Sequence, residues 1–561
     1  MLALLLPLGA RGESAVVAPE VLVANGEQWA VATGHPLATE AGAEVLRKGG
    51  NAIDAAVAAS LALGVAEPYG SGLGGKLVLL YCDGKTGEVS GIEALCPAPA
   101  ALDPPEFAAL SRADRRYGFR SVCVPGLPAG LAAAHAKWGA KPWRELVMPA
   151  AELADAGVAV SAEQRQLYVP HARQINAAPE VAQFYAVDGA TPDVGDVLVN
   201  ADLAATLRLF AEGGRDGFYR GETAERIVEA CHAAGSPMSL EDFASYKPRF
   251  TQPLAVGYRG YRVYSSPPPL TGGVTVLGLL AAQEATAWPE GKARDAAYIH
   301  GLCRLLRPLY PRISRVVADV PSAEADAWAL LGEASIDRAR EKARRPAPAD
   351  RDSAPAGFFS EPTLDDRVDA STSHLVVVDR ENNLVSLTQS LSLHFGACAI
   401  APGTGVLLND SMSNFATATR SSVNYVRGGK RPRSTVAPVV VTRDGVPVLT
   451  LGIPGGQRIP TTTAQLLVDV LGGRVQLDEA FRRPRFHLRR ATASRQPTNQ
   501  IDLEAEFPPE LDEQLEELGW RVSRKESGSS YFGGGNAAML LPGGRLVAVA
   551  DPRRTNSAAA E

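Results

Sequence analysis

The sequence predicts a mixed α/β (α+β) fold, because helical patterns fill its first two thirds and short β-like runs dominate its last third. Residues 38–66 are Ala-rich with apolar residues at three- and four-residue spacing, which predicts two helices broken at Gly49-Gly50. Residues 126–157 and 220–234 have the same helical pattern. With 46% hydrophobic and 21% charged residues, the 561-residue chain can bury at least one large core.

Four short apolar runs predict β-strands. They are LVLLYC at 77–82, HLVVVD at 374–379, NLVSLTQSLSL at 383–393 and APVVVTRDGVPVLTLGI at 437–453. The last run has Asp444-Gly445 at its centre, and Asp-Gly is a typical two-residue hairpin turn. We therefore expect this run to form a β-hairpin.

Residues 337–371 separate the helical part of the chain from the β-rich part. The segment is rich in Pro, Ala and charged residues, a composition that disfavours a packed element, so we expect an exposed connector. It leads to a strand that we expect to begin at about Thr372. A nucleophile that must become a chain terminus needs this arrangement, because the bond before it has to be reachable while the residue itself is held rigidly.

The charge of the chain points to a small-molecule substrate. A net charge of −6 without a long block of one sign gives no reason to expect nucleic acid or a membrane as a partner. The first residues, MLALLLPLGARGES, hold an apolar run too short to span a membrane and not preceded by Lys or Arg. These features favour a cytoplasmic enzyme, with a degenerate signal peptide, and hence a secreted or periplasmic protein, as the alternative.

The cysteines argue against a metal site. They lie far apart, without a CxxC pair and without histidines at metal-ligand spacing, so we expect no zinc. The six are Cys82, Cys96, Cys123, Cys231, Cys303 and Cys398.

The GSGLGG segment at 70–75 matches the GxGxxG dinucleotide-binding pattern, but its context is wrong. That fingerprint follows a strand and opens a helix, whereas here helical sequence precedes it and strand sequence follows. We interpret it as a backbone turn that needs glycine.

Thr372, in the TSH segment at 372–374, is the candidate nucleophile, although Thr and Ser are also common where strands begin. A free N-terminal Thr carries its own general base, because an α-amine has a pKa near about 8 and can take the proton from Oγ. Before cleavage, the same Oγ can attack the Ser371 carbonyl and give an ester that water hydrolyses. His374 is expected to be a structural hydrogen-bonding residue.

The PGGQR segment at 454–458 is the candidate oxyanion-binding element. It follows a predicted strand, and the unhindered N–H groups of its two consecutive glycines could converge on a developing oxyanion. An ordinary turn is the alternative.

Nine segments in order along the chain resemble the γ-glutamyltransferase (γ-glutamyltranspeptidase) family. They are HPLATEAGAEVLRKGGNAIDAAVAASLALGVAEPYGSGLGG at 35–75, VPGLPAG at 124–130, GFYRG at 217–221, SSPPPLTGG at 265–273, TSHLVVVD at 372–379, FGACAIAPGTGVLLND at 395–410, GIPGGQR at 452–458, PRFH at 484–487 and ADPRR at 550–554. A series this long and ordered is highly specific.

The resemblance implies a four-layer αββα N-terminal-nucleophile hydrolase sandwich built from two autoproteolytic subunits. The large subunit would be residues 1–371 and the small one 372–561, forming one intertwined domain and a heterodimer from one precursor. No metal or organic cofactor is implied. Carried over to this sequence, the catalytic positions are Thr372 as nucleophile, Ser390 as the hydroxyl that hydrogen-bonds it, and Gly455 and Gly456 as oxyanion glycines. Ser434 and Thr435 match the paired hydroxyl residues that bind the substrate carboxylate.

The sequence departs from the family pattern at positions that bind the substrate in the family. Leu95 stands where the family has an Arg that clamps the α-carboxylate of a γ-glutamyl group, and Asn414 stands where an Asp holds the α-ammonium. Ser392 and Ser411 replace two other polar contacts. Losing a bidentate guanidinium–carboxylate pair costs on the order of 2–5 kcal/mol.

We therefore expect a redirected hydrolase whose substrate is not a standard γ-glutamyl compound. Relatives of this kind cleave cephalosporin acyl groups, or hydrolyse a carbon–carbon bond to release an oxalyl unit in the biosynthesis of alkylproline-containing antibiotics, and the second group is our preferred hypothesis. Two alternatives stay open: an ordinary γ-glutamyltransferase or glutathione hydrolase, and an uncleaved, non-enzymatic binding protein.

Overall fold

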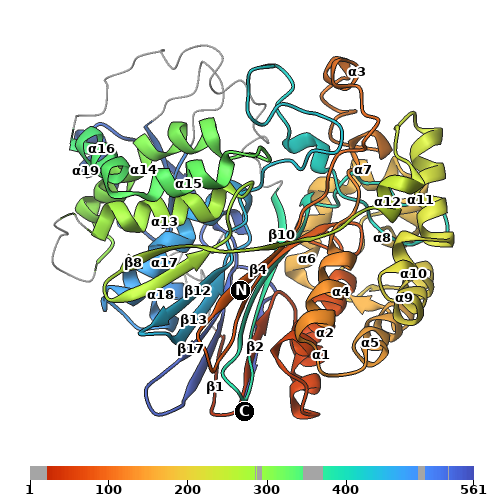
Figure 1. Cartoon of the computed structure of the whole chain (residues 1–561), viewed down its shortest axis with the longest axis horizontal. Helices are drawn as coiled ribbons and strands as arrows, with labels where there is room; N and C mark the ends of the chain where they lie inside the picture. Colours follow the sequence, from red (N-terminus) through yellow and green to blue (C-terminus); the bar gives the residue numbers. More distant parts are fainter. Residues whose placement is uncertain (1–21, 285, 287–292, 345–369, 490–498, 529) are drawn as a thin grey trace, which may run out of the picture.

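The computed structural model describes residues 22–284, 286, 293–344, 370–489, 499–528 and 530–561. Two seven-stranded sheets lie face to face at the centre, and helices cover the outer face of each sheet (Figure 1). This is the predicted four-layer αββα sandwich. The apolar inner faces of both sheets and the inward faces of the helices form the core.

All strand pairs within the two central sheets are antiparallel. The first sheet has the order β1 (Leu22–Gly26), β18 (Leu546–Ala550), β17 (Asn536–Leu540), β13 (Val446–Gly452), β12 (Val439–Arg443), β9 (Tyr261–Ser265) and β8 (Leu254–Tyr258). The second has the order β19 (Ser557–Ala560), β2 (Ala30–Thr33), β10 (Ala370–Val378), β11 (Leu384–Leu393), β3 (Lys76–Cys82), β4 (Val89–Ala94) and β7 (Arg249–Thr251). Segments from both ends of the chain therefore complete each sheet.

Small sheets lie at the periphery. β5 (Val158–Ala159) pairs with β6 (Val197–Leu198), and β14 (Phe486–Leu488), β15 (Gln500–Glu504) and β16 (Arg521–Lys525) form a three-stranded sheet.

The predicted break between the first two helices is confirmed. Helix α1 (Pro36–Arg47) ends before Gly49, whose φ of 76° suits glycine, and α2 (Ala52–Ala66) begins after Asn51. The Asn51 side chain accepts hydrogen bonds from the amides of Ile53 and Asp54, and the Asp54 carboxylate accepts one from the Asn51 amide. This capping box starts a helix that is buried on almost every side, which explains its Ala-rich sequence.

The other helices divide between the two outer layers (Figure 1). Beside α1 and α2 lie α3 (Pro104–Ala109), α4 (Leu127–Trp138), α5 (Trp143–Ala156), α6 (Ala162–Tyr168), α7 (Ala172–Asn176), α8 (Pro179–Tyr185), α9 (Ala201–Gly213), α10 (Asp216–Tyr219), α11 (Glu222–Ala233) and α12 (Leu240–Ala244). The opposite layer holds α13 (Thr271–Glu284), α14 (Ala296–Val316), α15 (Ala323–Leu331), α16 (Glu333–Arg344), α17 (Ile459–Leu471), α18 (Leu477–Arg482) and α19 (Glu510–Glu517). Of the helices in the described part of the chain, none has the length and hydropathy needed to cross a bilayer.

The predicted connector is wrong at both ends. Its first residues belong to α16, where Ile336, Ala339 and Ala343 are buried at helical spacing against α14. Charged residues between these positions obscured the helical periodicity in the sequence. At the other end, β10 begins at Ala370 rather than at about Thr372. Residues 345–369 lie outside the described residues.

Two turn predictions are confirmed. Asp444 and Gly445 have φ values of 52° and 80° and join β12 to β13 as a two-residue hairpin. The GSGLGG segment lies between α2 and β3, so it does not have the strand-to-helix context of a dinucleotide site.

A buried ion network joins two of the segments that resemble the family. Arg485, from PRFH, pairs with Asp551, from ADPRR, and both side chains are fully buried. Arg553 donates to Asp551 at 3.2 Å and to Glu504 at 2.6 Å. Two carboxylates and two guanidinium groups thus offset one another between β14–β15 and the end of β18.

Removing one member should leave a buried charge without its partner. We expect Asp551→Ala to lower the free energy of unfolding by about 3–5 kcal/mol, measured by urea denaturation. The matched control is Asp478→Ala, which removes the exposed pair between Asp478 and Arg482 in α18 and should cost about 0.5 kcal/mol or less. Equal costs for the two variants would contradict a structural role for the network.

Candidate active site

Thr372 lies in an irregularity of the central strand β10. In the pairing of β10 with β11, Ser371 lies opposite Ser392 and Ser373 lies opposite Gln389, so the register shifts at Thr372. Ser371 is 0% exposed and Thr372 is 3% exposed. The predicted scissile bond is therefore inside the protein, not on an exposed connector.

Hydroxyl groups surround the carbonyl oxygen of Ser371. Thr372 Oγ1 lies 2.5 Å from it, and Ser390 Oγ on β11 also donates to it at 2.5 Å. The two hydroxyl oxygens are 3.4 Å apart. The backbone N–H of Ser392 donates to Ser390 Oγ at 2.9 Å, which fixes the Ser390 side chain. The structure thus brings Ser371, Thr372 and Ser390 together.

The residues on both sides of Thr372 lie against the start of the glycine-rich turn. Ser371 Oγ lies 2.5 and 2.6 Å from the carbonyl oxygens of Tyr69 and Gly70. A Cβ on Gly70 would come within 2.6 Å of Ser373 Oγ, so this position has no room for a side chain. The lack of a side chain at Gly70 therefore allows the backbone of the GSGLGG segment to pack closely against β10.

Glu67 and Arg554 are two charged groups of this site that the sequence analysis missed. The buried Glu67 carboxylate accepts hydrogen bonds from Ser373 Oγ at 2.7 Å, Tyr69 Oη at 2.9 Å and Thr555 Oγ1 at 3.2 Å. Burial raises the pKa of Glu67, whereas these hydrogen bonds and the charge of Arg554 lower it. Arg554 donates to the Thr372 carbonyl at 2.8 Å. Arg554 is the second Arg of the ADPRR segment at 550–554, and this motif was the sequence feature that could have indicated it.

His374 has the environment of a structural residue. Its Nδ1 lies 2.9 Å from Thr388 Oγ1, and its ring packs against Gly452 of the facing sheet. Burial lowers the pKa of His374 to about 3, so the ring is neutral at physiological pH.

The two candidate oxyanion glycines begin a short helix that faces β10. Gly455 and Gly456 have φ values of 138° and 58°, and Gly456–Arg458 forms a 3-10 turn that contacts β10 and leads into α17. Amide N–H groups at a helix start carry partial positive charge and suit an oxyanion. Both φ values are positive, in the region that favours glycine, which explains why glycine occupies both positions.

Ser434 and Thr435 lie on a separate segment beside the start of α13. The Thr271 N–H donates to the Ser434 carbonyl at 2.8 Å, and a Cβ on Gly272 would clash with the Thr435 carbonyl oxygen at 1.9 Å. The SSPPPLTGG segment thus positions this pair, whose residues are partly exposed. Their hydrogen bonds do not connect them to Thr372.

Leu95 follows β4 and is 1% exposed in the apolar core. Its backbone is held at both ends: the N–H donates to Glu93 Oε1 at 2.9 Å, and the carbonyl accepts from Tyr246 Oη at 2.9 Å. The buried Arg431 pairs with Glu93 at 2.7 Å. Leu95 thus offers no polar group to a ligand.

The three other predicted substrate positions form one cluster around an unexpected lysine. Ser392 Oγ contacts Ser411 Oγ at 3.1 Å and accepts from Asn414 Nδ2 at 3.0 Å. Lys76 Nζ donates to the same Ser392 oxygen at 2.5 Å. The available signal for Lys76 was a charged residue at the start of the apolar run LVLLYC.

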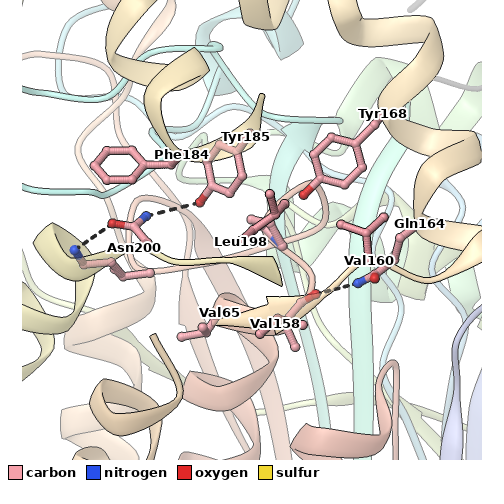
Figure 2. Close-up of a pocket in the computed structure, with 12 residues that line it drawn as sticks. Val65, Val158, Val160, Gln164, Tyr168, Phe184, Tyr185, Leu198 and Asn200 are labelled. Atoms are coloured by element: carbon pink, nitrogen blue, oxygen red, sulfur yellow. Dashed lines mark hydrogen bonds between the residues drawn. The ribbon is translucent and has the colours of Figure 1, made fainter. Parts of the chain in front are cut away.

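A small cavity of about 20 Å³ lies apart from this cluster, between α6, α8 and the β5–β6 ribbon (Figure 2). Its lining is mostly apolar. Its two amides have protein partners, because Gln164 donates to the Ala66 carbonyl and Asn200 contacts Tyr185 Oη and the Gly405 carbonyl.

Comparisons with known proteins agree with the geometry. The family model described as gamma-glutamyltranspeptidase matches residues 38–561. The glutathione hydrolase proenzyme of Bacillus subtilis (strain 168) is 30% identical over 478 residues, which cover 82% of this chain and 81% of the relative.

Two solved structures superpose over almost the whole chain. The cephalosporin acylase from Bacillus halodurans has a TM-score of 0.84 with 25% identity and 99% of both chains covered. The protein named LmbA2991HD has a TM-score of 0.83 with 25% identity, covering 95% of this chain and 98% of its own. The chain therefore belongs to the γ-glutamyltranspeptidase family and is an enzyme of the N-terminal-nucleophile hydrolase class, not a non-enzymatic binding protein.

Proposed function

We propose that this chain is a precursor that cleaves itself between Ser371 and Thr372 and then uses Thr372 as the nucleophile of a hydrolase. The observation that carries the proposal is the contact of both Thr372 Oγ1 and Ser390 Oγ with the Ser371 carbonyl oxygen. The bond is also too deeply buried for another protease to reach. The Bacillus subtilis relative is named a proenzyme, which supports the proposal.

The first step of cleavage needs only two hydroxyl groups that already contact the Ser371 carbonyl oxygen. Thr372 Oγ attacks the Ser371 carbonyl carbon while the Ser390 hydroxyl donates to the carbonyl oxygen, which becomes an oxyanion. The C–N bond then breaks, the hydroxyl proton ends on the new α-amine, and water hydrolyses the ester. The products are a large subunit, residues 1–371, and a small subunit, residues 372–561, held together as a heterodimer by strands of both in each sheet.

Turnover would repeat the same chemistry on a substrate. The freed α-amine of Thr372 takes the proton from its own Oγ, which attacks the substrate carbonyl. The N–H groups of Gly455 and Gly456 would stabilise the oxyanion from the start of the 3-10 turn. The acyl-enzyme is then hydrolysed by water.

The substrate is proposed not to be a standard γ-glutamyl compound. The buried, apolar Leu95 cannot bind an α-carboxylate, and the neutral Asn414 is a weaker partner than Asp for an α-ammonium. One candidate is hydrolysis of a carbon–carbon bond in an α-keto acid in alkylproline antibiotic biosynthesis. The acyl-enzyme would hold the oxalyl unit, the electron pair and a proton would go to the leaving carbon, and water would release oxalate. An ordinary glutathione hydrolase is the second candidate, favoured by the 30% identity to the Bacillus subtilis relative.

The first prediction from this proposal concerns maturation. Purified protein should separate into two bands on denaturing electrophoresis, and N-terminal sequencing of the smaller should begin Thr-Ser-His-Leu. Thr372→Ala should stay one chain without turnover, because the attacking oxygen is gone, whereas Thr372→Ser should keep part of both activities. Ser390→Ala should slow cleavage by about 100-fold or more, since it removes a donor to the oxyanion.

His374→Gln is the matched control, because His374 neighbours the site but does not touch the scissile carbonyl. It should cleave itself much faster than Ser390→Ala. Substrate turnover by a single-chain Thr372→Ala protein would show that another residue carries the chemistry.

The second prediction concerns γ-glutamyl donors. With self-cleaved wild-type protein, kcat/KM for glutathione and γ-glutamyl-p-nitroanilide should stay well below about 10⁴ M⁻¹s⁻¹, the lower end for efficient enzymes. The reason is the loss of the α-carboxylate and α-ammonium partners at Leu95 and Asn414. Values at or above that level would favour the ordinary glutathione hydrolase instead.

A further inference from the structure

Lys76 is a buried cation beside the nucleophile that the proposed chemistry does not use. It is the first residue of β3, and in the pairing of β3 with β11 it lies directly opposite Ser390. Residues opposite each other in an antiparallel pair point to the same face of the sheet. The Lys76 side chain, 4% exposed, therefore shares its face with the hydroxyl group that contacts Thr372.

The Lys76 ammonium lies among the positions that the family resemblance assigns to substrate recognition. Ser392 Oγ accepts from Lys76 Nζ and from Asn414 Nδ2, and it contacts Ser411 Oγ. In the family pattern, the residue at position 414 holds the ammonium group of the substrate. Here the protein supplies an ammonium group of its own to this cluster.

The charge of Lys76 is not balanced by an ion pair. Among the described residues, no carboxylate makes an ion pair with Nζ, and its hydrogen-bond partner is a neutral hydroxyl. Asp410 acts on Lys76 through space, and its two oxygens accept from other groups, the Leu393 N–H at 2.8 Å and Ser413 Oγ at 2.7 Å. Burial lowers the pKa of Lys76, and the nearby charge of Asp410 opposes this by raising it.

A buried ammonium group that no carboxylate contacts directly is stabilised by an anion placed beside it, and such an anion would also oppose the lowering of the Lys76 pKa by burial, so this arrangement favours a negatively charged ligand. The same charge would repel the ammonium group of a γ-glutamyl donor. It also accounts for Asn414, because an Asp at this position would be drawn to Lys76 instead of to a ligand.

We propose that Lys76 is the specificity-determining cation of the acyl pocket, and that the native acyl group presents a carboxylate and no ammonium group to it. This inference rests on the proposed role of Thr372 as nucleophile. It extends that proposal by stating that the acyl group of the substrate is negatively charged. The carboxylate of an α-keto acid would supply this charge.

The test compares probes that differ only in charge. Succinyl- and glutaryl-p-nitroanilide carry a terminal carboxylate, and the corresponding carboxamides have nearly the same shape without the charge. Self-cleaved wild-type protein should prefer each carboxylate over its carboxamide by about tenfold or more in kcat/KM. Lys76→Met should reduce this ratio to about one, and Lys76→Arg should keep a preference for the carboxylate.

The same variants separate this inference from the proposed function. If the wild-type protein is cleaved and turns over both probes without a preference for the carboxylate, the role of Lys76 is wrong and that of Thr372 stands. If the wild-type protein is never cleaved, the proposed function fails first. If no anilide is turned over, calorimetric binding of glutarate decides. Equal affinity for wild-type and Lys76→Met protein, or no binding to either, would overturn the inference, and weaker binding to Lys76→Met would support it.

A gain-of-function variant gives an independent check. Asn414→Asp alone should not improve turnover of γ-glutamyl-p-nitroanilide, because the new carboxylate would pair with Lys76. The double change of Lys76→Met with Asn414→Asp should improve it by about tenfold or more, because the carboxylate is then available to the substrate ammonium. A full gain from Asn414→Asp alone would contradict the placement of Lys76 in the pocket.

Discussion

The antiparallel pairing of β10 with β11 is the constraint on which the candidate site depends. β10 runs through the middle of its sheet, with β2 on one side and β11 on the other, so its backbone is fixed over most of its length. The register of this strand pair shifts once, between Ser371 and Ser373, and the shift coincides with the proposed scissile bond. A bulge re-aims a side chain in an otherwise rigid strand. Rigid neighbours and a local irregularity together bring a hydroxyl group to a backbone carbonyl.

Buried charges then connect this strand to the end of the chain. Asp551 holds Arg485 and Arg553 in the core, and the next residue, Arg554, reaches the Thr372 carbonyl. The same segment continues to Thr555, which donates to Glu67. After the proposed cleavage, Thr372 would no longer be covalently linked to Ser371. Hydrogen bonds to its carbonyl and to Ser373 would keep it in place afterwards.

The sequence predicted the parts of this structure that rest on local chemistry. The break between α1 and α2, the Asp444-Gly445 hairpin and the turn function of GSGLGG each follow from residues close together in the chain. The family pattern, a longer-range signal, predicted the four layers. The connector was misjudged where charged residues hid the helical period of α16. Contacts between distant segments, such as Lys76 with Ser392 or Arg554 with Thr372, depend on register between strands, which one sequence does not reveal.

Ser392 takes part in both the proposed catalytic contacts and the proposed recognition cluster, through its backbone and its side chain respectively. Its φ of 89° is unusual for a residue with a side chain, a cost that persists only where the surroundings impose it. Its N–H orients Ser390 beside Thr372, the proposed nucleophile, while its Oγ accepts from Lys76 and Asn414. A substitution that changes only the side chain would alter the pocket and leave the backbone contact to Ser390. A substitution that relaxes the backbone would also move Ser390 away from the Ser371 carbonyl. Substrate preference can therefore shift through side chains around Ser392 while the strained backbone retains the hydroxyl geometry that the proposed self-cleavage requires.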